Sequence, residues 1–135
     1  MNWKLVASLS LAGLVMGLAA VFVVPTNVEP MFWGPLMLGS ALAIARFAPK
    51  RYFLHGFATS LANCVWITGS QIAFAETYLA RHPEEAAMLA QVSDSPRIAM
   101  AVTGPLFGVA FGIVLGLLAF GASRIVKSAS RAATA

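Results

Sequence analysis

The sequence predicts an all-α, polytopic membrane protein: an antiparallel bundle of four transmembrane helices with one short amphipathic helix on its outer surface. Two observations predict this fold class. Of the 135 residues, 59% are hydrophobic and only 10% are charged, whereas an ordinary soluble domain has about 25% charged residues. Four apolar stretches approach or exceed the length of ~20 residues that a helix needs to cross the bilayer core. We expect helices because an α-helix satisfies its backbone hydrogen bonds within the segment, as lipid requires.

The four predicted spans belong to a single membrane domain, residues 1–135. In chain order they cover residues 5–24, 31–47, 53–79 and 98–123. The first span is uncharged and stops before Pro25, and the third carries Glu76 as its one formal charge. The fourth is uncharged and rich in glycine. Because the first three spans are joined by short connections, we expect consecutive spans to pack as antiparallel neighbours.

The longest connection, between the third and fourth spans, has room for a surface helix over residues 83–92. Pro83 suits the first position of a helix, and Glu84 and Glu85 suit its positive end. Apolar residues follow at helical spacing: Met88, Leu89 and Val92. Asp94-Ser95-Pro96 then ends this helix and begins the next.

The basic residues predict the orientation, because lysine and arginine are enriched in the short cytoplasmic loops of membrane proteins. Seven of the nine fall on one side of the predicted bundle: Lys4, Arg46, Lys50, Arg51, Arg124, Lys127 and Arg131. Arg81 and Arg97 fall on the other side, and all five acids lie on or near it. We therefore expect a multi-pass protein of a bacterial-type inner (plasma) membrane, with both termini in the cytoplasm.

One alternative concerns the first span. Residues 1–4 followed by an apolar run also resemble a secretory signal peptide, with Gly17-Leu18-Ala19 as a small-x-small cleavage site. A run of 20 apolar residues is long for the 7–15 residues of a signal-peptide core, which favours an uncleaved helix. Cleavage would leave three spans, with the C-terminus still inside.

Glycines in the fourth span form the most regular motif in the chain. They recur every four residues, at Gly104, Gly108, Gly112 and Gly116, and the first span repeats the spacing at Gly13 and Gly17. Small residues let membrane helices approach closely, so that dispersion contacts accumulate where no hydrophobic force acts between helices. We expect these glycines to pack against another helix, which belongs either to the same chain or to a second copy.

The third span carries a polar face with two interpretations. Four of its residues form a candidate polar path through the membrane: Thr59, Asn63, Ser70 and Gln71. On the functional interpretation this face lines a route for a small solute or an ion. On the structural interpretation these side chains hydrogen-bond neighbouring helices, and the absence of an ionisable residue at mid-depth favours this interpretation.

The sequence contains no enzyme signature, and we expect no catalytic residue, cofactor or metal. His55 and His82 are predicted on opposite membrane faces, and the single cysteine excludes an internal disulfide. Basic residues scattered along an apolar chain make no nucleic-acid groove. The expected partners are the lipid bilayer and either further copies of the chain, as a homo-oligomer, or a larger membrane complex. The leading hypothesis is therefore a non-enzymatic packing or accessory subunit, and the alternative is a transporter or channel.

Overall fold

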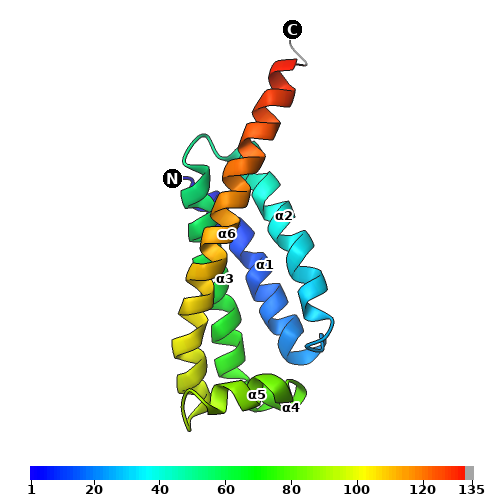
Figure 1. The fold of residues 1–135 in the computed structure, drawn as a ribbon, viewed down its shortest axis with the longest axis vertical. Helices are drawn as coiled ribbons and strands as arrows, with labels where there is room; N and C mark the ends of the chain where they lie inside the picture. Colours follow the sequence, from blue (N-terminus) through cyan, green and yellow to red (C-terminus); the bar gives the residue numbers. More distant parts are fainter. Residues whose placement is uncertain (133–135) are drawn as a thin grey trace.

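A computed structural model describes the backbone of residues 1–132 and the side chains of residues 1–126. This part of the chain forms helices and no strands, which confirms the all-α class (Figure 1). In chain order the helices are α1 (Trp3–Phe22), α2 (Glu29–Phe47), α3 (Tyr52–Ala73), α4 (Ala75–Arg81), α5 (Pro83–Ala90) and α6 (Pro96–Ala132). Two of them, α1 and the Pro96–Val126 part of α6, are long and apolar enough to cross a membrane.

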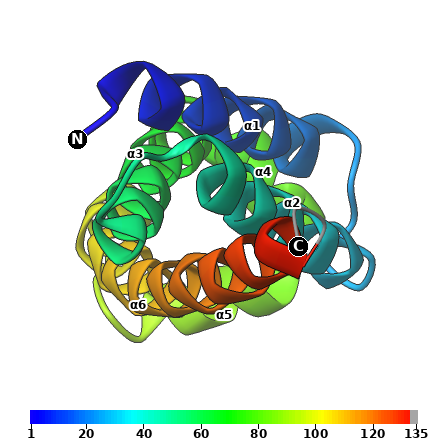
Figure 2. The same cartoon turned by 90° about the horizontal axis from the view of Figure 1, so that it is seen from above.

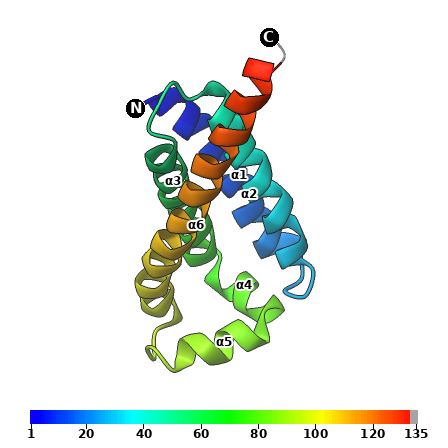
Figure 3. The ribbon, with the colours of Figure 1, turned by 45° about the horizontal axis from the view of Figure 1, so that its top comes forward.

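Four long helices form the body of the molecule, and two short ones cross one end of it. Helix α3 packs along both α6 and α1, while α2 packs mainly on α6. Seen from above, α1, α3, α6 and α2 follow one another around the molecule (Figure 2). Helices α4 and α5 lie at the end that we call the capped end (Figure 3). The N-terminus and the end of α6 lie at the opposite, open end (Figure 1).

Local signals explain where the helices begin. The side chain of Asn2 accepts a hydrogen bond from the Leu5 N–H and so caps α1. Helix α2 begins with Glu29 and Pro30. The Glu29 carboxylate is attracted to the positive end of the helix, and Pro30 fits the first turn because the N–H groups there have no partner within the helix. Arg51, before α3, has φ 57°, the left-handed backbone that lets the chain reverse within the short α2–α3 connection.

The prediction of one uninterrupted helix over residues 53–79 is wrong, because the chain breaks at Phe74. Helix α3 ends at Ala73 after 22 residues, and α4 starts at Ala75 and runs across the capped end. Those 22 residues are about 33 Å long at 1.5 Å each, the thickness of a bilayer core. No proline or glycine marks the break. Instead, Tyr78 and neighbouring side chains are buried against α1 and α6, which turns the chain sideways.

The ends of three other elements also differ from the prediction. Helix α1 ends at Phe22 rather than at residue 24. Helix α5 ends at Ala90 rather than at residue 92. Helix α6 continues to Ala132, beyond the predicted limit of residue 123. Its 37 residues are about 56 Å long, more than a bilayer core needs. The side chains of Lys127 and Arg131, expected on the cytoplasmic side, lie outside the described residues.

The apolar core consists of two clusters, one at each end. At the capped end Ala20, Val21, Ala75, Tyr78 and Met100 join α1, α4 and α6. At the open end Ala41, Ile44, Ala48, Leu115 and Ala119 join α2 and its C-terminal connection to α6. Between these clusters the contacts involve small and polar side chains, and the candidate sites lie there and at the capped end.

Candidate functional site

The glycines of α6 lie against α3 of the same chain. We call this contact the α3–α6 seam; in it the predicted glycines of α6 meet both aromatic and small residues of α3. A Cβ placed on Gly116 would lie 2.7 Å from the Phe53 ring, one on Gly112 2.9 Å from the Phe57 ring, and one on Gly108 2.8 Å from the Cys64 Cβ. One on Gly104 would meet the Thr68 hydroxyl. The two helices can approach this closely only because α6 has no side chains there.

Helix α3 contributes its own stripe of small residues to the seam, which the sequence analysis missed. A Cβ on Gly56 would lie 2.7 Å from the Leu115 carbonyl oxygen and 2.8 Å from the Gly116 Cα, so the two backbones touch there. The Ser60 hydroxyl donates to the Gly108 carbonyl at 3.2 Å, and the Cys64 thiol donates to the Gly104 carbonyl at 3.0 Å. Gly56, Ser60, Cys64 and Thr68 recur every four residues, and that periodicity could have revealed the stripe.

The opposite side of α3 meets α1, and this contact unites two sets of predicted residues. A Cβ on Gly13 would lie 2.5 Å from Asn63 Oδ1 and 2.7 Å from the Asn63 Cα. A Cβ on Gly17 would lie 3.2 Å from the Ser70 hydroxyl. The structure thus places the glycines of α1 directly on Asn63 and Ser70, two of the candidate path residues.

The four candidate path residues differ in burial. Thr59 is fully buried, Asn63 and Ser70 are 9% and 8% exposed, and Gln71 is half-buried. The Ser70 hydroxyl donates to the Trp66 carbonyl of its own helix at 2.7 Å. Thr59 Oγ1 and Asn63 Oδ1 are buried without a hydrogen-bond partner. A buried polar atom left unpaired costs about 1–3 kcal/mol, so these two atoms are the part of the polar face that no hydrogen bond satisfies.

At the open end, His55 connects α3 to the start of α1. Its Nδ1 lies 3.0 Å from the Arg51 carbonyl oxygen, and its Nε2 lies 2.9 Å from the Asn2 backbone nitrogen. A carbonyl only accepts and an N–H only donates, so Nδ1 must carry a proton and Nε2 must not. The neutral ring is therefore satisfied on both sides, although it is 1% exposed.

The capped end holds a group of polar and aromatic side chains that we call the end cluster: Glu29, Trp33, Tyr78, His82 and Glu85. The Trp33 indole donates to Glu29 Oε1 at 3.1 Å, and the other carboxylate oxygen lies 3.8 Å from His82 Nε2. The rings of Tyr78 and His82 stack with centroids 4.2 Å apart. The Tyr78 hydroxyl donates to Glu85. The end cluster thus connects α2 with α4, α5 and the α4–α5 junction.

The electrostatics of the end cluster keep the tyrosine protonated. Burial, together with the hydrogen bond to Glu85 and the negative charge of that carboxylate, raises the pKa of the Tyr78 phenol well above its ordinary value. Tyr78 therefore remains a neutral hydrogen-bond donor at physiological pH. No local sequence motif predicts this cluster, because Glu29 lies far from the other charged members along the chain.

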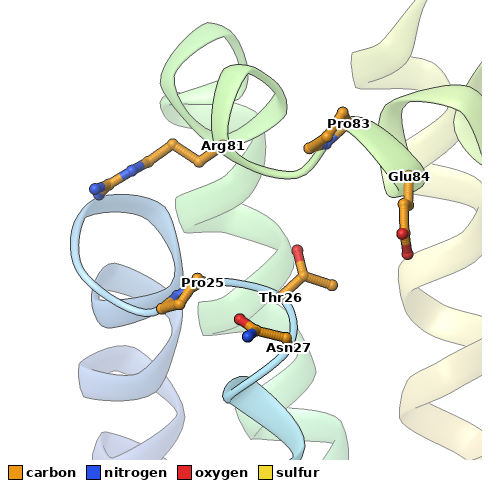
Figure 4. A pocket seen from close by; sticks show the side chains of 6 residues that line it. All are labelled: Pro25, Thr26, Asn27, Arg81, Pro83 and Glu84. Atoms are coloured by element: carbon orange, nitrogen blue, oxygen red, sulfur yellow. The ribbon is translucent and has the colours of Figure 1, made fainter.

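A pocket of about 270 Å³ lies outside the end cluster, between the α1–α2 turn and the α4–α5 junction (Figure 4). Its lining consists of Pro25, Thr26, Asn27, Arg81, Pro83 and Glu84. The Arg81 guanidinium points away from the other lining residues and donates to the Phe22 carbonyl. The labelled polar groups do not converge on one point, so the pocket offers no built site for a ligand.

Two findings bound the chemistry of these sites. Among the described residues, no three histidine, cysteine, aspartate or glutamate side chains gather closely enough to hold a metal ion. His55 and His82 lie at opposite ends of the bundle, on α3 and at the α4–α5 junction.

Neither a protein-family model, nor a curated protein, nor a solved structure matches this chain.

Proposed function

We propose that this chain is a small integral membrane protein that crosses the bilayer four times, through α1, α2, α3 and α6. In this proposal it acts without enzymatic chemistry, as a packing or accessory subunit of a bacterial-type inner (plasma) membrane. The observation that carries the proposal is the distribution of its side chains: many large apolar residues face outward, whereas much of the interior consists of small and polar residues.

All four long helices expose large apolar side chains. Large apolar side chains are 40–70% exposed along each of them: Leu11 and Val15 on α1, Leu38 and Leu42 on α2, Leu54 and Val65 on α3, and Leu106, Phe107 and Leu117 on α6. The buried set includes Ser10, Ser40, His55, Thr59, Ser60 and Asn63. A continuous apolar surface of this extent marks contact with lipid or with other proteins. It supports membrane insertion of α2 and α3 together with α1 and α6.

The positions of the charges support the proposed orientation. The open end carries Lys4 at the start of α1, Arg46, Lys50 and Arg51 around the α2–α3 connection, and Arg124 near the end of α6. The acids Glu76, Glu84 and Glu85 lie on α4 and α5 at the capped end, and Asp94 lies in the connection from α5 to α6. The positive-inside rule then favours the open end, with both termini, on the cytoplasmic side.

Reporter fusions test this topology. We expect reporters fused after Lys50 and after Ala135 to be active in the cytoplasm, and one fused after Glu85 to be active outside. A reporter after Ala135 that is active outside would contradict the orientation. N-terminal sequencing that starts at Ala20 would instead identify residues 1–19 as a cleaved signal peptide and reduce the spans to three.

The second candidate function is transport of a small solute or ion along α3, and the unpaired atoms of Thr59 and Asn63 favour it. A water-filled path would hydrate both atoms. Asn63→Cys in a Cys64→Ser background, exposed to a water-soluble thiol reagent, tests the path. We expect no labelling, because Asn63 is 9% exposed and covered by Gly13. Rapid labelling would support transport, and solute uptake into proteoliposomes would then identify the substrate.

A further inference from the structure

The histidine of the end cluster is held between two hydrogen-bond acceptors. His82 Nδ1 lies 2.9 Å from the Tyr78 carbonyl oxygen. Its Nε2 faces Glu29 Oε2 at 3.8 Å and has no hydrogen-bond partner. The residue is 0% exposed, so bulk water does not reach the ring to satisfy the second nitrogen.

Neither neutral form of the ring fits this environment. A neutral imidazole has one N–H and one bare lone pair. With the proton on Nδ1, the lone pair of Nε2 faces a carboxylate oxygen; with the proton on Nε2, the lone pair of Nδ1 faces the Tyr78 carbonyl. The imidazolium has two N–H groups, so it can donate to both oxygens. The contrast with His55 is direct, because the Nε2 of His55 faces an N–H donor.

The carboxylate opposite His82 is held in position. The Trp33 indole donates to Glu29 Oε1, which leaves Oε2 directed at the histidine. The side chain of Glu29 is 14% exposed, so the pair is largely shielded from solvent. Two ionised partners attract more strongly in such surroundings than in water.

The other titratable and charged groups at this end do not replace Glu29. They are Glu76, Tyr78 and Arg81 of α4, Glu84 and Glu85 of α5, Asp94 in the α5–α6 connection, and Arg97 of α6, whereas the end of α1 carries none. Tyr78 donates to Glu85, Arg81 to the Phe22 carbonyl and Arg97 to the Ile72 carbonyl. Glu76, Glu84 and Asp94 are exposed.

We propose that His82 and Glu29 form a proton-binding site, in which a proton taken up by the ring ties the start of α2 to the α4–α5 junction. The ligand is a proton from the compartment that the capped end faces, and uptake forms one N–H bond on Nε2 without breaking another. The α1–α2 turn and the α4–α5 junction are then held together by an ion pair. Acidification closes the capped end, and a rise in pH loosens it.

The first test measures thermal unfolding of the full chain in detergent at about pH 5.5 and pH 8, the range over which histidine changes charge. A site that binds a proton in the folded protein stabilises it below the transition and loses that effect as pH rises. We expect the gain in Tm from pH 8 to pH 5.5 to be about 4 °C larger in the wild type than in Glu29→Gln. Glu84→Gln, an exposed acid on the same end, should retain the wild-type gain.

The second test reads the protonation of the imidazole ring directly rather than through thermal stability. In the wild-type protein with ¹⁵N-labelled histidine, NMR at about pH 5.5 should show protons on both ring nitrogens of one histidine. Loss of that signal in His82→Gln assigns it. The proposal is overturned if His82 retains an unprotonated ring nitrogen at this pH, or if Glu29→Gln and the wild type have the same pH dependence.

Discussion

At the scale of single residues, the structure distinguishes glycines that are needed from glycines that are only tolerated. Gly56 and Gly69 lie on the same helix, α3. A Cβ on Gly56 would meet backbone atoms of α6 within 2.8 Å, whereas a Cβ on Gly69 would meet nothing within 4 Å. Backbone atoms of a packed helix cannot rotate away as a side chain can, so the two positions respond oppositely to the same substitution.

We expect Gly56→Ala to lower stability by about 1–3 kcal/mol, the usual range for overpacking a close contact. Gly69→Ala should be neutral or stabilising by about 0.5–1 kcal/mol, since alanine loses less backbone entropy in a helix. Thermal unfolding in detergent measures both. Equal behaviour of the two variants would contradict the backbone contact between α3 and α6.

At the scale of elements, α4 is separated from α3 by contacts rather than by a helix-breaking residue. The ring of Phe74, at the break, packs edge-on against Phe22 of α1, with centroids 5.0 Å apart and planes at 66°. The next turn buries Ala75 and Tyr78 against α1 and α6. The direction of α4 therefore depends on docking to helices that are distant in the sequence.

We expect Phe74→Ala to loosen α4, because an edge-to-face aromatic pair contributes about 0.5–1.5 kcal/mol beyond its buried area. Hydrogen exchange of the amides of residues 75–81 should become faster. Phe111→Ala is the matched control, because Phe111 is similarly exposed and stacks only within α6, on Phe107. Unchanged exchange in Phe74→Ala would show that this ring does not hold α4 in place.

At the scale of the whole molecule, the predicted glycine groove is occupied within one chain. Every glycine of the four-residue repeat on α6 has a neighbour on α3. Any self-association of the protein must therefore use another surface, such as the outward apolar faces of the helices. The glycine repeat therefore bears on the stability of the fold and not on the oligomeric state, a distinction that the sequence pattern alone could not make.

We expect Gly116→Leu to lower the detergent melting temperature while the oligomeric state, measured by size-exclusion chromatography with light scattering, stays as in the wild type. Overpacking of the seam, about 1–3 kcal/mol, is the reason. Val114→Leu, on the exposed side of α6, should melt like the wild type. Loss of an oligomer without loss of thermal stability would place the glycines against a second copy instead.

The sequence by itself determined the helical class and the register of the glycine repeat. These are local properties: apolar length requires helices, and four-residue spacing puts small side chains on one face whatever they contact. It also placed Arg46, Lys50 and Arg51 around the α2–α3 connection, which lies at the open end. The same reasoning could have identified the stripe from Gly56 to Thr68, because its spacing is equally regular.

Only the tertiary structure decided which partner each face meets. The break at Phe74 has no local signal, since it results from burial of Tyr78 against α1 and α6. The placement of Gly13 on Asn63 depends on how two helices cross. The pairing of Glu29 with His82 unites residues that lie far apart along the chain. Sequence periodicity defines the face of a helix but does not say which other element packs on that face. It is the packing of the start of α2 near the α4–α5 junction that leaves His82 between two oxygen acceptors.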